Sequence, residues 1–70
     1  MSGTIRVTVN GEERQIAAGL TVEALLRSLD LQPALVVVER NREILERDRY
    51  GDVEVEAGDV LELVHFVGGG

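Results

Sequence analysis

Apolar and polar residues alternate over residues 4–9, with isoleucine or valine at every second position. A repeat of two residues predicts a strand with one buried face. Asn10-Gly11 follows directly and predicts a tight hairpin, because both central residues of a type I′ turn need φ > 0. We therefore expect residues 12–17 to return as a second strand.

The apolar spacing then changes to three and four residues. Val22, Leu25, Leu26 and Leu29 fall on one face of a helix. Thr21 precedes them as a residue that can cap the helix through its hydroxyl. Pro33 prevents further helix and disfavours the α conformation just before it. These signals predict a helix over about residues 21–30.

The second half of the chain reads as short extended pieces joined by turns. Residues 35–38 are apolar and rich in β-branched side chains, which favours a strand buried on both faces. The remaining expectations are a turn at 39–42 with Asn41 as its pivot, a short strand at 43–45, a polar loop or helical turn at 46–52, a brief extended piece at Val53 and Val55, a tight turn at 56–59 and a final strand at 60–67.

One helix between the second and third strands predicts an α+β domain in which the helix packs on one face of a mixed sheet. We expect four to five strands, with the last strand beside the first. The chain of 70 residues divides into one domain at 1–67 and a flexible glycine tail at 68–70.

Composition narrows the chemistry that this domain can perform. The chain has no cysteine and one histidine, which leaves no disulfide, no thiol nucleophile and no metal cluster built on these residues. A net charge of −6 and only two aromatic residues disfavour nucleic-acid binding. We expect no membrane segment and no leader sequence, and hence a cytoplasmic protein.

The tail itself, Gly68, Gly69 and Gly70, has no side chain to pack or to react. A thin backbone ending in a carboxylate suits entry into a narrow site on another protein, over a reach of roughly 10 Å. The alternative is a frayed chain end without a function.

Several stretches taken together resemble a known family. They are Val9-Asn10-Gly11-Glu12, Gly19-Leu20-Thr21-Val22 with Leu25-Leu26, Gly58-Asp59, and Val64-His65-Phe66-Val67-Gly68-Gly69-Gly70. The chain is similar over its whole length to the ThiS family of sulfur carriers in thiamine biosynthesis. The resemblance implies a ubiquitin-like β-grasp fold.

The resemblance also implies a reaction at Gly70. An adenylyltransferase of the ubiquitin-activating type would adenylate its carboxylate with ATP. A persulfide supplied by a cysteine desulfurase or a related donor would convert the adenylate to a thiocarboxylate, and thiazole synthase would take the sulfur. An ionised carboxylate is a poor electrophile, so such activation is needed. The chain would then be a carrier and not an enzyme, with no cofactor of its own.

Near the tail, Val64 and Phe66 fall on the strand face that also carries Glu62, opposite Leu61 and Leu63. We expect Val64 and Phe66, together with the following Val67, to form a partner interface. The alternative is that the loop at 46–52, through Tyr50, covers them.

Two other features have a plain structural interpretation. His65 lacks an identifiable partner for general-base chemistry and is interpreted as a strand residue or a partner contact. The acidic pairs Glu12-Glu13 and Glu54/Glu56 are interpreted as solvated surface.

Other functions share parts of this pattern. Carriers for molybdopterin synthesis or tRNA thiolation have the same fold and a Gly-Gly end. A TGS-like regulatory β-grasp module has a similar strand-helix-strand order and a Gly-Asp turn, and protein tagging in the manner of ubiquitin shares the activation step.

Overall fold

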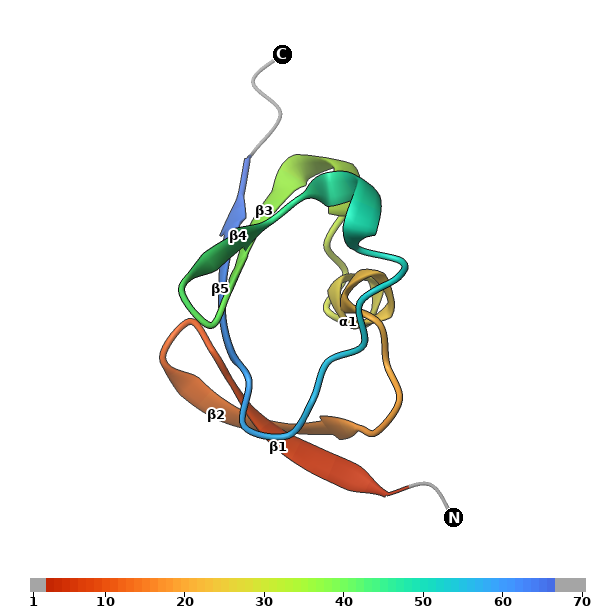
Figure 1. Ribbon diagram of the computed structural model, residues 1–70, viewed down its shortest axis with the longest axis vertical. Coiled ribbons are helices and arrows are strands. Elements are labelled where there is room, and N and C mark those ends of the chain that lie inside the picture. Colours follow the sequence, from red (N-terminus) through yellow and green to blue (C-terminus); the bar gives the residue numbers. More distant parts are fainter. Residues whose placement is uncertain (1–2, 67–70) are drawn as a thin grey trace.

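The computed structural model describes residues 3–66, which form a five-stranded mixed sheet with one α-helix on one face (Figure 1). The strands are β1 (Thr4–Val9), β2 (Glu12–Ala17), β3 (Val36–Arg40), β4 (Glu43–Leu45) and β5 (Val60–His65). The helix α1 spans Val22–Ser28, and two 3-10 turns span Pro33–Leu35 and Arg47–Arg49. The α+β class and the single helix predicted from the sequence are confirmed.

The strand order across the sheet is β2-β1-β5-β3-β4. β5 lies at the centre, parallel to β1 and antiparallel to β3. The pairing of the last strand with the first, as expected of a β-grasp, is therefore confirmed. The β1–β5 ladder is short, because only Thr8↔Val60 and Val9↔Leu61 are paired.

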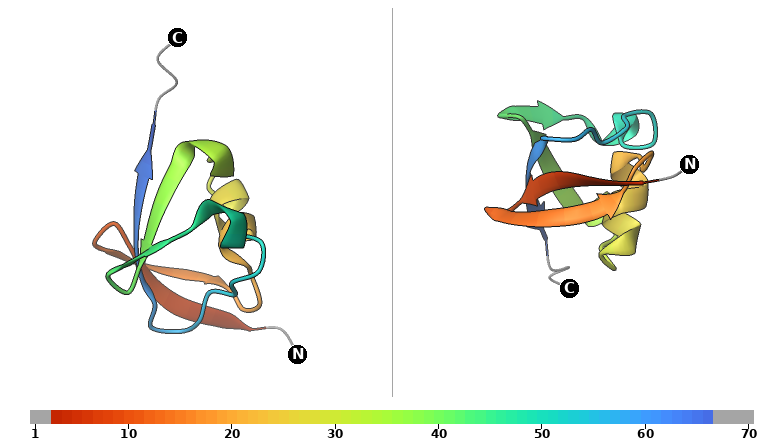
Figure 2. Two further views of the ribbon diagram at one scale, coloured as in Figure 1. Left: turned by 45° about the horizontal axis from the view of Figure 1, so that its top comes forward. Right: turned by 90° about the horizontal axis from the view of Figure 1, so that it is seen from below.

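The core lies between α1 and the sheet, and Figure 2 shows that α1 covers one face of the sheet. Its buried members come from the alternating positions of the strands, from the apolar face of the helix and from the long segment before β5: Val7, Val9, Val22, Leu25, Leu26, Val36, Val38, Tyr50, Val55 and Leu61. We call the opposite side of the sheet, which no other element within residues 3–66 covers, the outer face.

The helix begins where the sequence predicted and ends earlier. Thr21 is the N-cap, and its Oγ1 accepts the N–H of Ala24 at 3.1 Å. The expected end near residue 30 is wrong, because α1 ends at Ser28 and Asp30 adopts a left-handed φ of 62°. The N–H of Leu31 then donates to the carbonyl of Leu26, as in a Schellman motif. Glycine is the usual residue at the position that Asp30 occupies, so the sequence carried no clear signal for this helix end.

The prediction that β3 is buried on both faces is also wrong. Val36 and Val38 are fully buried, whereas Val37 between them is half-buried on the outer face. The strand also continues through Glu39 and Arg40, which the sequence had assigned to a turn. Pairing with β4 and β5 on both sides keeps these two polar residues in the sheet.

The three predicted tight turns are present. Asn10 and Gly11 have φ of 50° and 84°, as type I′ geometry requires. Asn41 is the pivot of the second hairpin, with φ of 52°, and Arg42 after it also has positive φ. At the third turn Gly58 has φ of 87°, and the N–H of Asp59 donates to the carbonyl of Glu56.

Candidate functional site

The predicted site lies where β5 ends. Phe66 is the last described residue, and its N–H donates to the carbonyl of Leu35 at 2.8 Å. Val67, Gly68, Gly69 and Gly70 lie outside the described residues, so the predictions placed on them, including tail flexibility and chemistry at Gly70, are not tested by the structure.

The two apolar residues before the tail are exposed, as the sequence predicted. Val64 and Phe66 expose 54% and 55% of their surfaces. The alternative, in which Tyr50 covers them, is wrong, because Tyr50 is buried in the core. Its hydroxyl donates to the carbonyl of Val36 at 2.7 Å and accepts the N–H of Val38 at 3.2 Å. The Tyr50 hydroxyl thus bonds backbone groups of β3 that lie beyond the end of β4.

The structure adds two exposed apolar residues that the sequence analysis missed. Ile44 exposes 65% of its surface and Val60 exposes 44%. Ile44 is paired with Glu39, which places it on the outer face with Val37 and Val64. We call the set formed by Val37, Ile44, Val60, Val64 and Phe66 the apolar patch.

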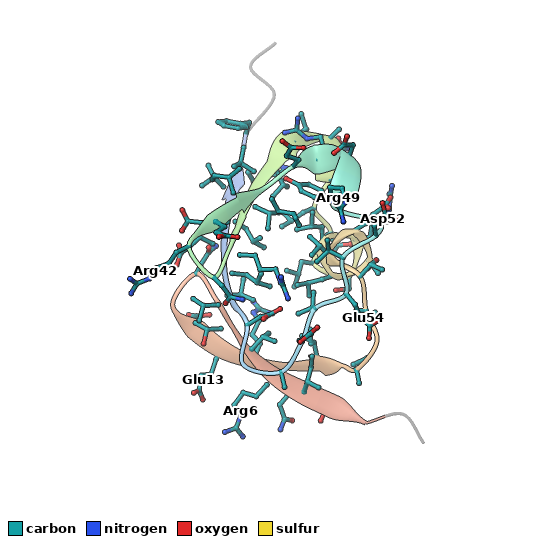
Figure 3. The ribbon with its side chains drawn as sticks, in the orientation of Figure 1. Arg6, Glu13, Arg42, Arg49, Asp52 and Glu54 are labelled. Carbon is teal, nitrogen blue, oxygen red and sulfur yellow. The ribbon has the colours of Figure 1, made fainter. Side chains whose placement is uncertain are left out.

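The apolar patch borders a shallow hollow of about 550 Å³. The charged residues that line this hollow are Glu39, Glu62 and Arg42. Figure 3 shows Arg42 projecting away from the tip of the β3–β4 hairpin, at the edge of this region. A partner that fits here presents apolar side chains together with groups that complement the two carboxylates.

The other half of the outer face is polar apart from Ala17. Its outward positions on β1 and β2 are Thr4, Arg6, Thr8, Glu13, Gln15 and Ala17. Arg6 and Glu13 project from this hairpin at the lower edge of Figure 3. The apolar residues are therefore gathered on the half of the sheet that leads to the tail.

The start of β5 is held by a buried carboxylate. Asp59 is 6% exposed and accepts hydrogen bonds from Arg40 Nε at 2.9 Å, Asn41 Nδ2 at 3.1 Å and the N–H of Glu56 at 2.9 Å. Burial by itself raises the pKa of the Asp59 carboxyl, but the hydrogen bonds from Glu56, Asn41 and Arg40 outweigh it and lower the pKa below its usual value. The sequence showed a Gly-Asp turn here but gave no sign of this network.

The remaining candidates are surface groups. His65 is an exposed β5 residue opposite Val36, as predicted for a strand position. The acidic pairs Glu12-Glu13 and Glu54/Glu56 are exposed, which confirms the solvated interpretation. Across residues 3–66, no cluster of three or more acidic or histidine side chains could hold a metal ion. In the same range no helix has the length and apolar character to cross a membrane.

Comparison with known proteins shows the family. Residues 7–70 match the model of the ThiS family. The chain is 52% identical over 50 residues to the sulfur carrier protein ThiS of Bacillus subtilis, covering 71% of this chain and 76% of that protein. It is 32% identical to the sulfur carrier protein ThiS of Escherichia coli, over 94% of this chain and all of that one.

A thiazole synthase of Paramagnetospirillum magneticum is 48% identical over 66 residues, which cover 94% of this chain. This chain spans only a fifth of the length of that synthase.

A solved structure agrees with the fold. The crystal structure of the thiamine biosynthesis protein ThiS from Geobacter metallireducens superposes with a TM-score of 0.80 at 39% identity, covering 94% of this chain and all of that one. Sequence and fold together show that this chain belongs to the ThiS family, the family that includes the sulfur carriers of thiamine biosynthesis.

Proposed function

We propose that this chain is a sulfur carrier protein of thiamine biosynthesis, which acts as a substrate of partner enzymes and carries sulfur on the carboxyl carbon of Gly70. The observation that supports this most directly is the family match, which extends through Gly70. The chemistry requires a free carboxylate on that residue. In this proposal the rest of the chain serves recognition.

The proposed chemistry has three steps. A carboxylate oxygen of Gly70 attacks the α-phosphate of ATP on the adenylyltransferase, giving an acyl-adenylate and pyrophosphate. A persulfide sulfur then attacks the acyl carbon and AMP leaves. Reduction of the resulting acyl disulfide by a thiol releases the thiocarboxylate. The adenylate supplies the leaving group that an ionised carboxylate lacks.

Thiazole synthase is the proposed recipient of this sulfur. Two relatives of this chain, from Paramagnetospirillum magneticum and Magnetococcus marinus, are named thiazole synthase and contain a region similar to it within a much longer chain. A shared chain keeps two functions together, which favours this recipient over molybdopterin synthesis or tRNA thiolation. Sulfur transfer to each purified recipient would separate these alternatives.

The proposed docking surface is the apolar patch together with Val67. Phe66 lies next to the tail and exposes more than half of its surface, so we expect an enzyme that receives Gly70 to contact Phe66 as well. An exposed apolar anchor buried by a partner is the usual form of an energetic hot spot.

The test is the mass of the intact protein after incubation with ATP, the adenylyltransferase, a cysteine desulfurase and cysteine. We expect one oxygen to be replaced by sulfur in the C-terminal peptide. Deleting Gly70 should abolish the change, because the arm shortens by roughly 3.5 Å. Adding one residue after Gly70 should abolish it too. A thiocarboxylate formed at the wild-type rate by either variant would refute the proposal.

Docking is tested separately. Phe66→Ala should weaken binding to the adenylyltransferase by more than about 1 kcal/mol while changing the stability of the domain by less than about 1 kcal/mol. Gln15→Ala, exposed on the polar half of the same face, is the matched control and should leave binding unchanged. Equal binding by both variants would show that Phe66 is not part of the docking surface.

A further inference from the structure

The backbone of β5 offers a second feature beside the apolar patch. β5 continues past the point where β1 ends, because β1 turns away at Asn10-Gly11. Figure 2, left, shows the C-terminal half of β5 with β3 on one side and no strand on the other. This leaves a short stretch of open sheet edge directly before the tail.

The register identifies the backbone groups on that edge. Val64 is paired with Val37, and the N–H of Phe66 donates to Leu35 on the β3 side. Backbone groups of successive strand residues point to opposite sides. The N–H and C=O groups of Leu63 and His65 therefore point to the side that β1 has left.

The N–H of Leu63 has a hydrogen-bond partner, whereas the carbonyl of Leu63 and the N–H of His65 have none among residues 3–66. The N–H of Leu63 donates to Asn10 Oδ1 at 2.8 Å. Within residues 3–66 the carbonyl of Leu63 and the N–H of His65 take part in no hydrogen bond. His65 is exposed and Leu63 is half-buried.

Elsewhere the fold uses side chains where a neighbouring strand ends. The hydroxyl of Tyr50 bonds two backbone groups of β3 beyond the end of β4. Asn41 Oδ1 accepts the N–H of Val60 at the start of β5. The outer edge of β2 is longer, but it carries Glu12, Glu13 and Arg14, and such charges guard edges against pairing. Among residues 3–66, no side chain bonds to the carbonyl of Leu63 or the N–H of His65.

We infer that an extended segment of the adenylyltransferase adds to this edge as a short strand, bonded to the carbonyl of Leu63 and the N–H of His65. The inference rests on the proposed function, because it assumes that this enzyme receives Gly70. Strand addition uses main-chain hydrogen bonds for affinity and side-chain pockets for specificity. Alternate side chains of the added segment would lie beside Val64 on the outer face, so we expect them to be apolar.

Strand addition would also fix the position of β5 along its axis, which the apolar patch cannot do. Apolar contacts are non-directional and allow β5 to slide along its axis. Hydrogen bonds to named backbone groups fix the register, and a slip of one residue would move Gly70 by roughly 3.5 Å. An adenylating site that tolerates little misplacement needs such a fixed register.

The test compares two substitutions at one position. His65→Pro removes the N–H, and proline is tolerated on an edge strand whose N–H faces away from the sheet. His65→Ala removes the imidazole and keeps the N–H. We expect the Kd for the adenylyltransferase to rise at least about fivefold for His65→Pro and to change less than about twofold for His65→Ala. Circular dichroism and thermal unfolding would establish that both variants are folded.

Amide hydrogen exchange on the unaltered protein gives an independent measurement. The His65 amide should exchange quickly in the free protein and slow at least about tenfold in the complex, because it gains a hydrogen-bond acceptor. Equal binding by the two variants, or a His65 amide that still exchanges quickly in the complex, would overturn the inference. If the wild-type chain is not adenylated at all, the proposed function fails instead.

Discussion

The two hairpin turns beside β5 have nearly the same backbone and different surroundings. The β1–β2 turn is Asn10-Gly11 and the β3–β4 turn is Asn41-Arg42, and both have positive φ at both positions. Their tips lie on opposite sides of β5 in the strand order, and both are at the left of Figure 1. Each is a two-residue turn between antiparallel strands.

Both asparagines hold β5 in the same way. Asn10 donates its N–H to Leu61 and accepts the N–H of Leu63 on Oδ1. Asn41 donates its N–H to Val60 and accepts the N–H of Val60 on Oδ1. An asparagine in a left-handed conformation thus completes the ladder where a strand has turned away.

The difference is the buried carboxylate. Asn41 also donates through Nδ2 to Asp59, whereas the Asn10 side chain has no charged partner among residues 3–66. The β1–β2 turn bonds to the neighbouring β5, whereas the β3–β4 turn also belongs to a network that joins its hairpin through Asp59 to the 56–59 turn at the start of β5. A similar turn sequence can therefore carry very different energetic weight. The following predictions test that difference.

Replacing Asp59 with asparagine should have the largest effect on stability. The substitution keeps the shape but removes the charge and places an N–H₂ group among three donors. We expect the free energy of unfolding to fall by about 3 kcal/mol, because hydrogen bonds to a buried charge are lost and the Arg40 charge is left unpaired. Urea unfolding at neutral pH measures it. A loss under about 1 kcal/mol would show that the network adds little to the fold.

Acid should remove part of the same stabilisation. The folded-state pKa of Asp59 lies below its unfolded value, so its contribution is fully present above about pH 4 and is lost as pH falls through the folded-state pKa. Urea unfolding of wild type and Asp59→Asn across this range should show their difference shrinking with falling pH. A constant difference would mean that the carboxyl of Asp59 has the same pKa in both states.

The two asparagines can be compared directly through glycine, which keeps the positive φ and removes only the side chain. Asn41→Gly should lower the free energy of unfolding by about 2 kcal/mol and Asn10→Gly by about 1 kcal/mol, because Asn41 loses an additional bond to a carboxylate. Chemical denaturation of the pair is the measurement. Equal losses would remove the distinction between the two turns.

The smallest expected change is a gain in stability. Arg42 has φ of 71°, a conformation that is unfavourable for a residue with a Cβ atom. Gly11 at the matching position has no Cβ atom and therefore no such strain. Arg42→Gly should raise the free energy of unfolding by about 0.5 kcal/mol after the entropy of glycine in the unfolded chain is included. Thermal unfolding of Arg42→Gly, measured together with wild type and Asn10→Gly, would detect this gain in stability. A loss of stability would mean that contacts of the Arg42 side chain outweigh the backbone strain.

The sequence by itself determined the features that depend on neighbouring residues. The alternation of residues 4–9, the Asn10-Gly11 turn, the Thr21 cap and the Gly58 turn were all predicted, because each is governed by contacts within a few residues. The exposure of Val64 and Phe66 followed from strand periodicity once Glu62 marked the outer face.

Only the tertiary structure decided the features that depend on register between distant segments. The pairing of Ile44 with Glu39 puts Ile44 in the apolar patch, and Asp59 meets Arg40 because β3 ends beside the start of β5. The open edge at His65 exists because β1 turns two residues after Thr8 meets Val60. These contacts join residues that are far apart in the chain, and no local pattern fixes which backbone groups find partners across such distances.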